Sequence, residues 1–130
     1  MFSVANDNGV NGSGDDMVAY CFAPVDGYSA FGTYTGNGTT DGPFVYTGFR
    51  PRWIMAKQID GAGGNWFIAD TARDTYNVQA NLLDANLSNA ERTANIYDIL
   101  SNGFKVRFAL SGTFIYAAFA ENPFSIARAR

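Results

Sequence analysis

The chain has 130 residues, among them 2 Trp, 7 Tyr and 11 Phe, with no His, a single Cys and a net charge of -3. This length predicts one domain, and the high apolar content predicts that it folds. The absence of His removes the commonest general base and the commonest transition-metal ligand. A single Cys forms neither an internal disulfide nor a structural zinc site, which needs several Cys or His ligands. We therefore expect no catalysis, no metal and no cofactor.

Nine basic and twelve acidic residues are scattered along the chain without a run of like charge. This distribution offers no electrostatic footprint for a nucleic acid or an anionic membrane. The N-terminus has neither a basic start nor a long apolar stretch, and no later apolar run approaches the ~20 residues of a membrane span. We expect no nucleic-acid binding, no membrane insertion, and synthesis in the cytoplasm without a signal peptide.

The beginning of the chain is predicted to lie outside the folded domain. Residues 6–16 are polar and rich in Gly, Asn and Asp, so they have nothing to bury. We interpret 1–16 as a flexible or partner-docking arm and 17–130 as a single domain. The acidic residues of the arm lack the spacing of a calcium loop, and turn chemistry explains them better.

From Met17 onward the apolar residues alternate with a period of two, which is typical of β-strands. Clusters of Gly, Asn, Asp and Pro separate the apolar runs, as expected of turns. The predicted strands are Met17–Ala23, Phe31–Thr35, Phe44–Phe49, Trp53–Gln58, Asn65–Asp70, Leu82–Leu87, Asn95–Leu100, Phe104–Leu110 and Thr113–Ala120. Short strands at such spacing predict an all-β fold, an antiparallel β-sandwich or jelly roll.

The last two predicted strands show the clearest patterns. In 104–110 the apolar residues share one face, while Lys105 and Arg107 lie on the other, as expected where one face is core. Residues 113–120 are apolar on both faces, which is typical of a central strand or of one covered by a neighbouring subunit. The turn residues Ser111 and Gly112 predict that the two strands pair as a hairpin.

The segment 77–100 is ambiguous. Residues 88–91 match a helix capping box, whereas several Asn residues interrupt any helical face. We predict mostly loop and edge strand in this segment, with one helical turn allowed.

The chain contains an internal echo. Val18–Val25 aligns with Ile115–Asn122, and both segments close on Phe-Ala before a turn. The echo between 17–23 and the last strand, 114–120, fits a chain built from the last strand of one module followed by one whole module. Two strands of one sandwich under the same burial constraint would produce the same echo, so both interpretations stay open.

Much of the chain after the arm resembles a module of uncharacterised bacteriophage proteins. The segments that carry the resemblance are Val18–Arg52, Trp53–Lys57, Asn65–Arg73, Tyr76–Asn77 and Tyr116–Phe124. In that family the module is often repeated in tandem inside larger virion-associated proteins. It is similar to concanavalin-like sandwiches that serve as tail-fibre or other exterior domains.

The resemblance implies a non-enzymatic bacteriophage structural protein on the exterior of the virion, in a tail fibre, a tail tip or a capsid decoration. Its implied partners are other virion proteins and further copies of the chain, and it implies a role in adhesion to the host surface. The chain lacks the long shaft of a whole fibre, which favours a small decoration or tip protein. The alternatives are a carbohydrate-binding module that recognises a host-surface glycan and a polysaccharide depolymerase.

One run of residues has the composition of a sugar site. Trp66 and Tyr76 offer aromatic faces for a pyranose ring, and Asp70, Arg73 and Asn77 offer planar groups for its hydroxyls. The structural interpretation is that Asp70 pairs with Arg73 to pin a turn while Trp66 fills the core. We favour this structural interpretation.

A second candidate contact region is formed by Arg50, Arg52 and Trp53. Guanidinium groups beside Trp are enriched at interfaces, which predicts a partner-docking surface. A surface turn that enters a strand at Pro51 explains the same residues equally well.

Overall fold

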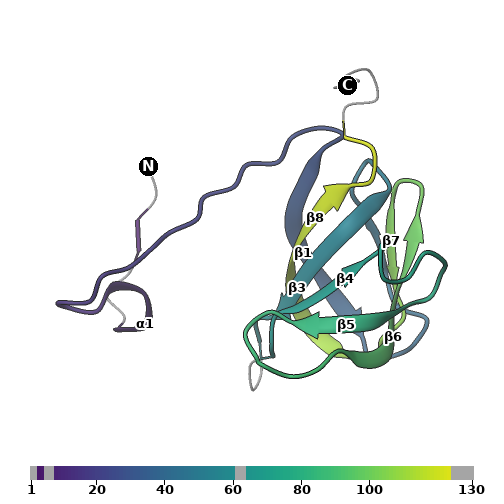
Figure 1. The fold of residues 1–130 in the computed structure, drawn as a ribbon. Coiled ribbons are helices and arrows are strands. Elements are labelled where there is room, and N and C mark those ends of the chain that lie inside the picture. The colour runs from purple at the N-terminus through teal and green to yellow at the C-terminus, as the bar shows by residue number, and fades with distance from the viewer. Residues whose placement is uncertain (1–2, 5–7, 61–63, 124–130) are drawn as a thin grey trace.

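The structure, a computed structural model, describes residues 3–4, 8–60 and 64–123. These residues form one short helix and eight strands (Figure 1). The elements are α1 (Asn8–Asn11), β1 (Ser29–Asn37), β2 (Phe44–Tyr46), β3 (Pro51–Gln58), β4 (Phe67–Asp70), β5 (Gln79–Asp84), β6 (Arg92–Leu100), β7 (Gly103–Val106) and β8 (Ser111–Ala120). The prediction of an all-β, sandwich-like fold is confirmed. None of the described helices is long and apolar enough to cross a membrane.

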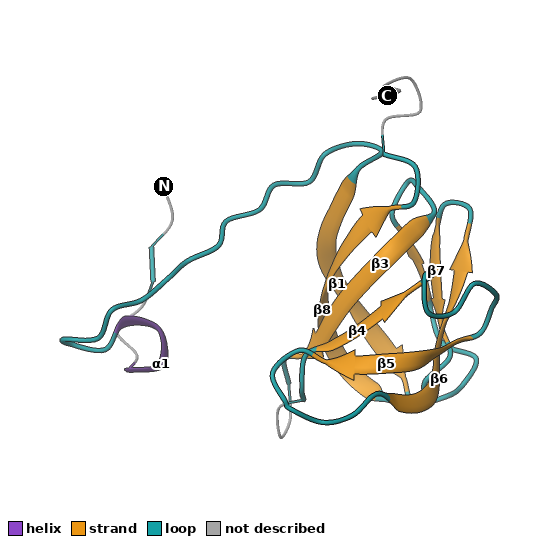
Figure 2. Ribbon diagram, viewed as in Figure 1, coloured by secondary structure: helices purple, strands orange, loops and turns teal. Residues whose placement is uncertain are grey.

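All eight strands belong to one antiparallel sheet in the order β1-β8-β3-β4-β5-β6-β7-β2. The sheet curves so strongly that it is nearly barrel-like (Figure 2). Strand β5 forms the corner, because its end pairs with β4 through Leu83 and Asp84 whereas its earlier residues pair with β6. As a result β1, β8 and β3 face β6 and β7 across the core.

An aromatic cluster fills the space between these two layers. The hydroxyl oxygens of Tyr34, on β1, and Tyr97, on β6, share a hydrogen bond of 2.9 Å. Burial raises the pKa of Tyr34 to about 12, although the hydrogen bond with Tyr97 partly opposes this rise. Phe104 of β7 is fully buried and packs edge-on against both tyrosine rings. Much of the aromatic content of the chain therefore serves the core.

Most predicted strands are confirmed in position, with small changes of length. One exception lies between 77 and 100, where β5 starts and ends three residues earlier than predicted. Both β5 and β6 lie inside the strand order, so the prediction of an edge strand there is wrong. Residues 88–91 form no helical turn. They connect the turn after β5 to the start of β6 in irregular structure.

The predicted hairpin between 104–110 and 113–120 is wrong. Strand β7 ends at Val106 and pairs with β6 and β2, whereas β8 pairs with β1 and β3. Residues 107–110 cross from one layer to the other, and Phe108 and Leu110 still contact the core on the way. The alternation of apolar residues predicted correctly which face of β7 is buried, but it did not predict which strands pair with β7. The expectation of a central strand at 113–120 is confirmed.

The predicted strand at Met17–Ala23 is also wrong. Residues 12–24 form no strand, and Figure 1 shows this part of the chain running away from the barrel. The side chains of Val18, Tyr20 and Phe22 are exposed to 78%, 82% and 67%. The segment has the pattern of a strand, but both edges of the similar strand β8 are already occupied by β1 and β3. From here on the name arm is used for residues 8–24, because residues 17–24, which were assigned to the domain, continue the extended chain outside the sheet.

Gly103→Ala is expected to destabilise the fold by about 1–3 kcal/mol, since a new methyl group would overpack the contact between β7 and β2. A Cβ at this position would collide with the carbonyl oxygen of Val45 and lie 3.0 Å from the ring of Phe44. Urea unfolding measures the loss. Gly64→Ala is the control, because its Cβ would meet Gln58 at an ordinary 3.4 Å. Equal stability of the two variants would contradict the prediction.

Candidate functional site

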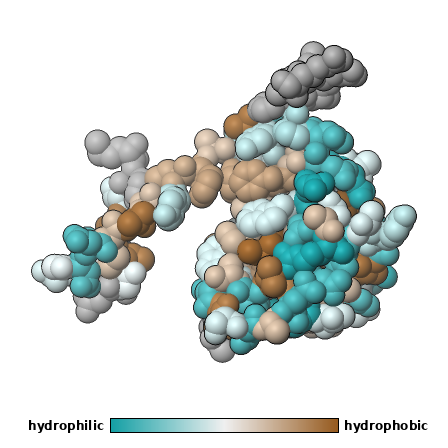
Figure 3. All heavy atoms as spheres, in the orientation of Figure 1, coloured by the Kyte–Doolittle hydropathy of each residue, from teal (hydrophilic) through white to brown (hydrophobic). Residues whose placement is uncertain are grey.

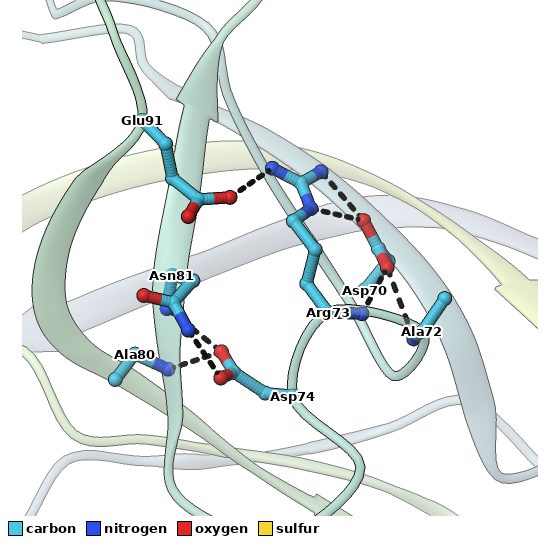
Figure 4. Close-up of polar contacts among 7 residues, drawn as sticks. All are labelled: Asp70, Ala72, Arg73, Asp74, Ala80, Asn81 and Glu91. Atoms are coloured by element: carbon cyan, nitrogen blue, oxygen red, sulfur yellow. Dashed lines mark hydrogen bonds and ion pairs between the residues drawn. The ribbon is translucent and has the colours of Figure 1, made fainter.

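Two of the polar residues predicted to form a sugar site, Asp70 and Arg73, lie at and just after the end of β4, where they bind each other (Figure 4). The guanidinium of Arg73 donates two hydrogen bonds to Asp70 Oδ2, from Nε at 2.8 Å and from Nη2 at 2.5 Å. Asp70 Oδ1 accepts hydrogen bonds from the backbone amides of Ala72 and Arg73, each at 3.0 Å. Asp70 therefore holds the turn after β4 in the manner of the structural interpretation.

Asp74 continues this network into β5. Its Oδ2 accepts hydrogen bonds from the backbone amides of Ala80 and Asn81, both at 2.7 Å, and its Oδ1 accepts one from Asn81 Nδ2 at 2.6 Å (Figure 4). The backbone carbonyl of Asp74 accepts a further hydrogen bond from Gln79 Nε2 at 2.8 Å. The loop between β4 and β5 is thus tied to the strand that follows it.

Asn77 and Tyr76, in the same loop, have different surroundings. The side-chain amide of Asn77 donates a hydrogen bond to the backbone carbonyl of Ile99 at 2.9 Å and accepts one from the backbone amide of Ile99 at 2.8 Å. Its side chain therefore bonds to β6 as the backbone of a neighbouring strand would. Tyr76 points into solvent and is 85% exposed. Of the polar groups predicted for sugar recognition, Asp70, Arg73 and Asn77 are engaged inside the protein.

Two carboxylates of this region are stabilised in their charged form. Burial alone would raise the pKa of Asp70, but the hydrogen bonds and the positive charge of Arg73 outweigh it and lower the pKa below 3.8. Hydrogen bonds from Arg92 lower the pKa of Asp84 in the same way, against the effect of burial. Arg92 donates two hydrogen bonds to Asp84, from Nε to Oδ2 at 2.9 Å and from Nη2 to Oδ1 at 2.8 Å.

Acid is expected to destabilise the protein through these two groups. A pKa lowered in the folded state contributes stability that is present above the ordinary value of 3.8 and is lost as the pH falls through the lowered folded pKa. Urea midpoints at about pH 6 and about pH 2.5 would measure this loss. The double variant Asp70→Asn/Asp84→Asn should be less stable at the higher pH and less sensitive to acid. Asp16→Asn, on the arm, should keep the wild-type profile, and an equally acid-sensitive double variant would contradict the assignment.

The residues of the second predicted contact region lie at the start of β3. Strand β3 begins at Pro51, as the turn interpretation predicted. Arg50 forms an ion pair with Glu121 at 2.8 Å and donates to the carbonyl of Ile99 at 3.4 Å. Arg52 is exposed. An ion pair as exposed as that of Arg50 contributes little stability.

Trp53 and Trp66 lie on the outer face of the layer formed by β1, β8, β3 and β4. Residues that pair directly across antiparallel strands point to the same face. The pairing places Phe119, Trp53 and Asp70 in one row across β8, β3 and β4. A second row runs Phe31, Ala117, Met55 and Ile68. Trp66 lies just before β4, with the ammonium of Lys57 5.7 Å from its ring centre.

A hollow of about 520 Å³ opens on this outer face, and we call it the Ala117 hollow. It exists because Ala117 is small while its partners in the row, Phe31 and Met55, are large. The lining is mostly apolar and comprises Tyr20, Phe22, Phe31, Gly32, Thr33, Met55, Trp66, Ile115, Tyr116 and Ala117. Trp66 therefore lines a surface hollow rather than filling the core. The other lining residues were not predicted as contact residues, although the apolar outer face of 113–120 was the signal.

The arm reaches this hollow with its aromatic residues. Phe22 stacks on Phe31 with ring centres 5.4 Å apart, and Tyr20 also lines the hollow. Figure 3 shows brown and tan side chains along the part of the arm next to the body. The hollow and the exposed apolar residues of the arm form the candidate functional site.

No group of three His, Cys, Asp or Glu side chains within the described ranges is placed to hold a metal ion. The chemistry that the site offers is apolar contact, together with the ammonium of Lys57 beside the Trp66 ring.

Residues 1–123 match a protein family described as a domain of unknown function, DUF7483. No curated protein and no solved structure matches the sequence significantly. Since the family match extends from residue 1 past the end of β8, it covers nearly the whole chain. The chain is a member of the DUF7483 family.

Proposed function

We propose that this protein is a non-enzymatic structural module on the exterior of a bacteriophage virion, in a tail fibre, a tail tip or a capsid decoration. It binds other virion proteins and copies of itself, and it contributes to adhesion to the host surface. The observation that carries the proposal is an apolar hollow beside an apolar arm that the folded body leaves exposed.

Exposure of this apolar surface to water is unfavourable. Three large side chains of the arm are exposed to solvent, those of Val18, Tyr20 and Phe22, and the hollow presents further apolar side chains on the same side of the molecule. Contiguous exposed apolar surface of this kind marks sites of protein association. The resemblance of the sequence to virion-associated modules supports a phage particle as the assembly.

The experiment that tests this proposal locates the protein on the particle. Antibodies raised against the purified chain should label the outside of intact virions of the phage that encodes it, and mass spectrometry should detect it in purified particles. Its absence from purified particles would exclude the structural role, whatever its behaviour in isolation.

A second candidate function, glycan recognition, is favoured by the position of Trp66 in the Ala117 hollow. An indole ring lining a surface hollow is suited to stacking on a sugar ring. A glycan array tests it, with Trp66→Ala expected to abolish a signal and Tyr76→Ala to weaken it. An absence of glycan signal for the wild-type protein would exclude this function. The depolymerase alternative stays a prediction, which an assay for new reducing ends in host polysaccharide tests.

A further inference from the structure

We propose that the Ala117 hollow binds the arm of a second copy of this chain, through residues Met17–Phe22, so that two chains exchange arms. The inference rests on the proposed assembly role and names the partner that occupies the site.

The hollow needs an apolar occupant with protruding side chains. The strands and the residue before β4 line it with apolar side chains that include Ala117, Met55 and Trp66, and the arm lines it with Tyr20 and Phe22. Few polar groups line it, so a polar ligand would lose hydrogen bonds to water without replacing them. An apolar side chain that enters loses only its contact with water.

The arm provides such side chains in a suitable spacing. In an extended chain Val18, Tyr20 and Phe22 project to the same side, because successive side chains alternate. The arm also echoes strand β8, which is itself a strand of this layer and carries Ala117. In that echo Phe22 corresponds to Phe119, whose ring contacts Phe31 and Trp53.

The arm of the same chain lines the hollow through Tyr20 and Phe22 and leaves the space of about 520 Å³ open. It is anchored beside β1, where Val25 pairs with Ser29 and Gly27 turns the chain with a φ of 69°. Phe22 reaches the rim of the hollow, but from there the arm runs outward, so Val18 and Tyr20 remain exposed (Figure 1). Reciprocal exchange between two copies would bury both arms at once, and such exchange is a low-cost route to a symmetric dimer.

Charge also favours the arm as the occupant. Asp15 and Asp16 directly precede Met17, and the ammonium of Lys57 lies beside Trp66 at one side of the hollow. Lys57 has no ion-pair partner among the residues that the structure describes. An incoming arm would bring two carboxylates toward this cation.

The first test measures self-association by analytical ultracentrifugation of the full chain. The wild-type protein should form a dimer, and both Val18→Ser/Tyr20→Ser on the arm and Ala117→Phe in the hollow should raise the dimer dissociation constant by about tenfold or more. Thr35→Phe is the matched control, because Thr35 lies on the same face outside the hollow and its replacement should leave the dimer unchanged. A monomeric wild type, or a dimer that both variants leave intact, would overturn the proposal.

The second test identifies which arm occupies the hollow, using Cys21, the single cysteine of the chain, as a reporter. Thr33→Cys at the hollow should form a disulfide with Cys21 under mild oxidation, whereas Ser101→Cys, in the turn between β6 and β7, should not. Mixing isotopically heavy and light chains shows whether the link joins two copies. A link confined within one chain, or no enrichment over Ser101→Cys, would refute arm exchange. Neither result bears on the presence of the protein in virions, so the two proposals fail separately.

Discussion

Phe104→Ala is expected to lower the free energy of unfolding by about 3–5 kcal/mol, because it removes a large buried ring and leaves a cavity that the surrounding layers close only in part. Phe104 has 0% exposure. Its ring centre lies 4.8 Å from that of Tyr97, 5.4 Å from that of Tyr116 and 5.9 Å from that of Tyr34. These rings come from β6, β8 and β1, so a single side chain joins both layers of the fold.

Urea unfolding followed by fluorescence measures this loss, with two variants for comparison. Phe104→Leu keeps most of the apolar volume and should cost less than Phe104→Ala. Tyr76→Ala removes an exposed ring and should change the stability by no more than about 0.5 kcal/mol. If Phe104→Ala were as mild as Tyr76→Ala, the aromatic cluster would not be the centre of the core.

The period-two alternation of apolar residues was sufficient to place most strands. It located β1, β3, β4 and β8 because each lies in the sheet with one face against the core. The same alternation failed at Met17–Ala23, where the residues resemble a strand but find no place in the sheet. A side-chain pattern shows that a segment can pair, whereas its inclusion in the sheet depends on contacts with residues far away in the sequence.

Strand pairing was harder to predict, because it depends on distant residues. The pattern of 104–110 continues past the end of β7, since Phe108 and Leu110 stay in contact with the core while the chain changes layers. A turn signal at Ser111 and Gly112 was therefore interpreted as a hairpin, although these residues begin β8. The crossing between layers has no local signature in the sequence.

The candidate site, too, could be predicted from the sequence only in part. The pairing of Asp70 with Arg73 was predictable because the two residues are close in sequence. The Ala117 hollow was not, because Phe31, Met55 and Trp66 meet only through the register of four strands. Its only local signal was a strand that is apolar on both faces.

Asp74→Ala is the second substitution from which we expect a large effect, a loss of about 2–4 kcal/mol. The backbone amides of Ala80 and Asn81 would lose a charged acceptor, and a hydrogen bond to a charged group contributes about 1.5–3 kcal/mol. Asp74→Asn keeps a carbonyl oxygen for these amides and should cost less. Urea unfolding measures the loss, and faster hydrogen exchange at Ala80 and Asn81 would assign it to the start of β5. An unchanged exchange rate at these amides would contradict the role of Asp74. Because the same loop carries Tyr76, any effect of Asp74→Ala on glycan binding would then reflect a loosened loop rather than a lost sugar contact.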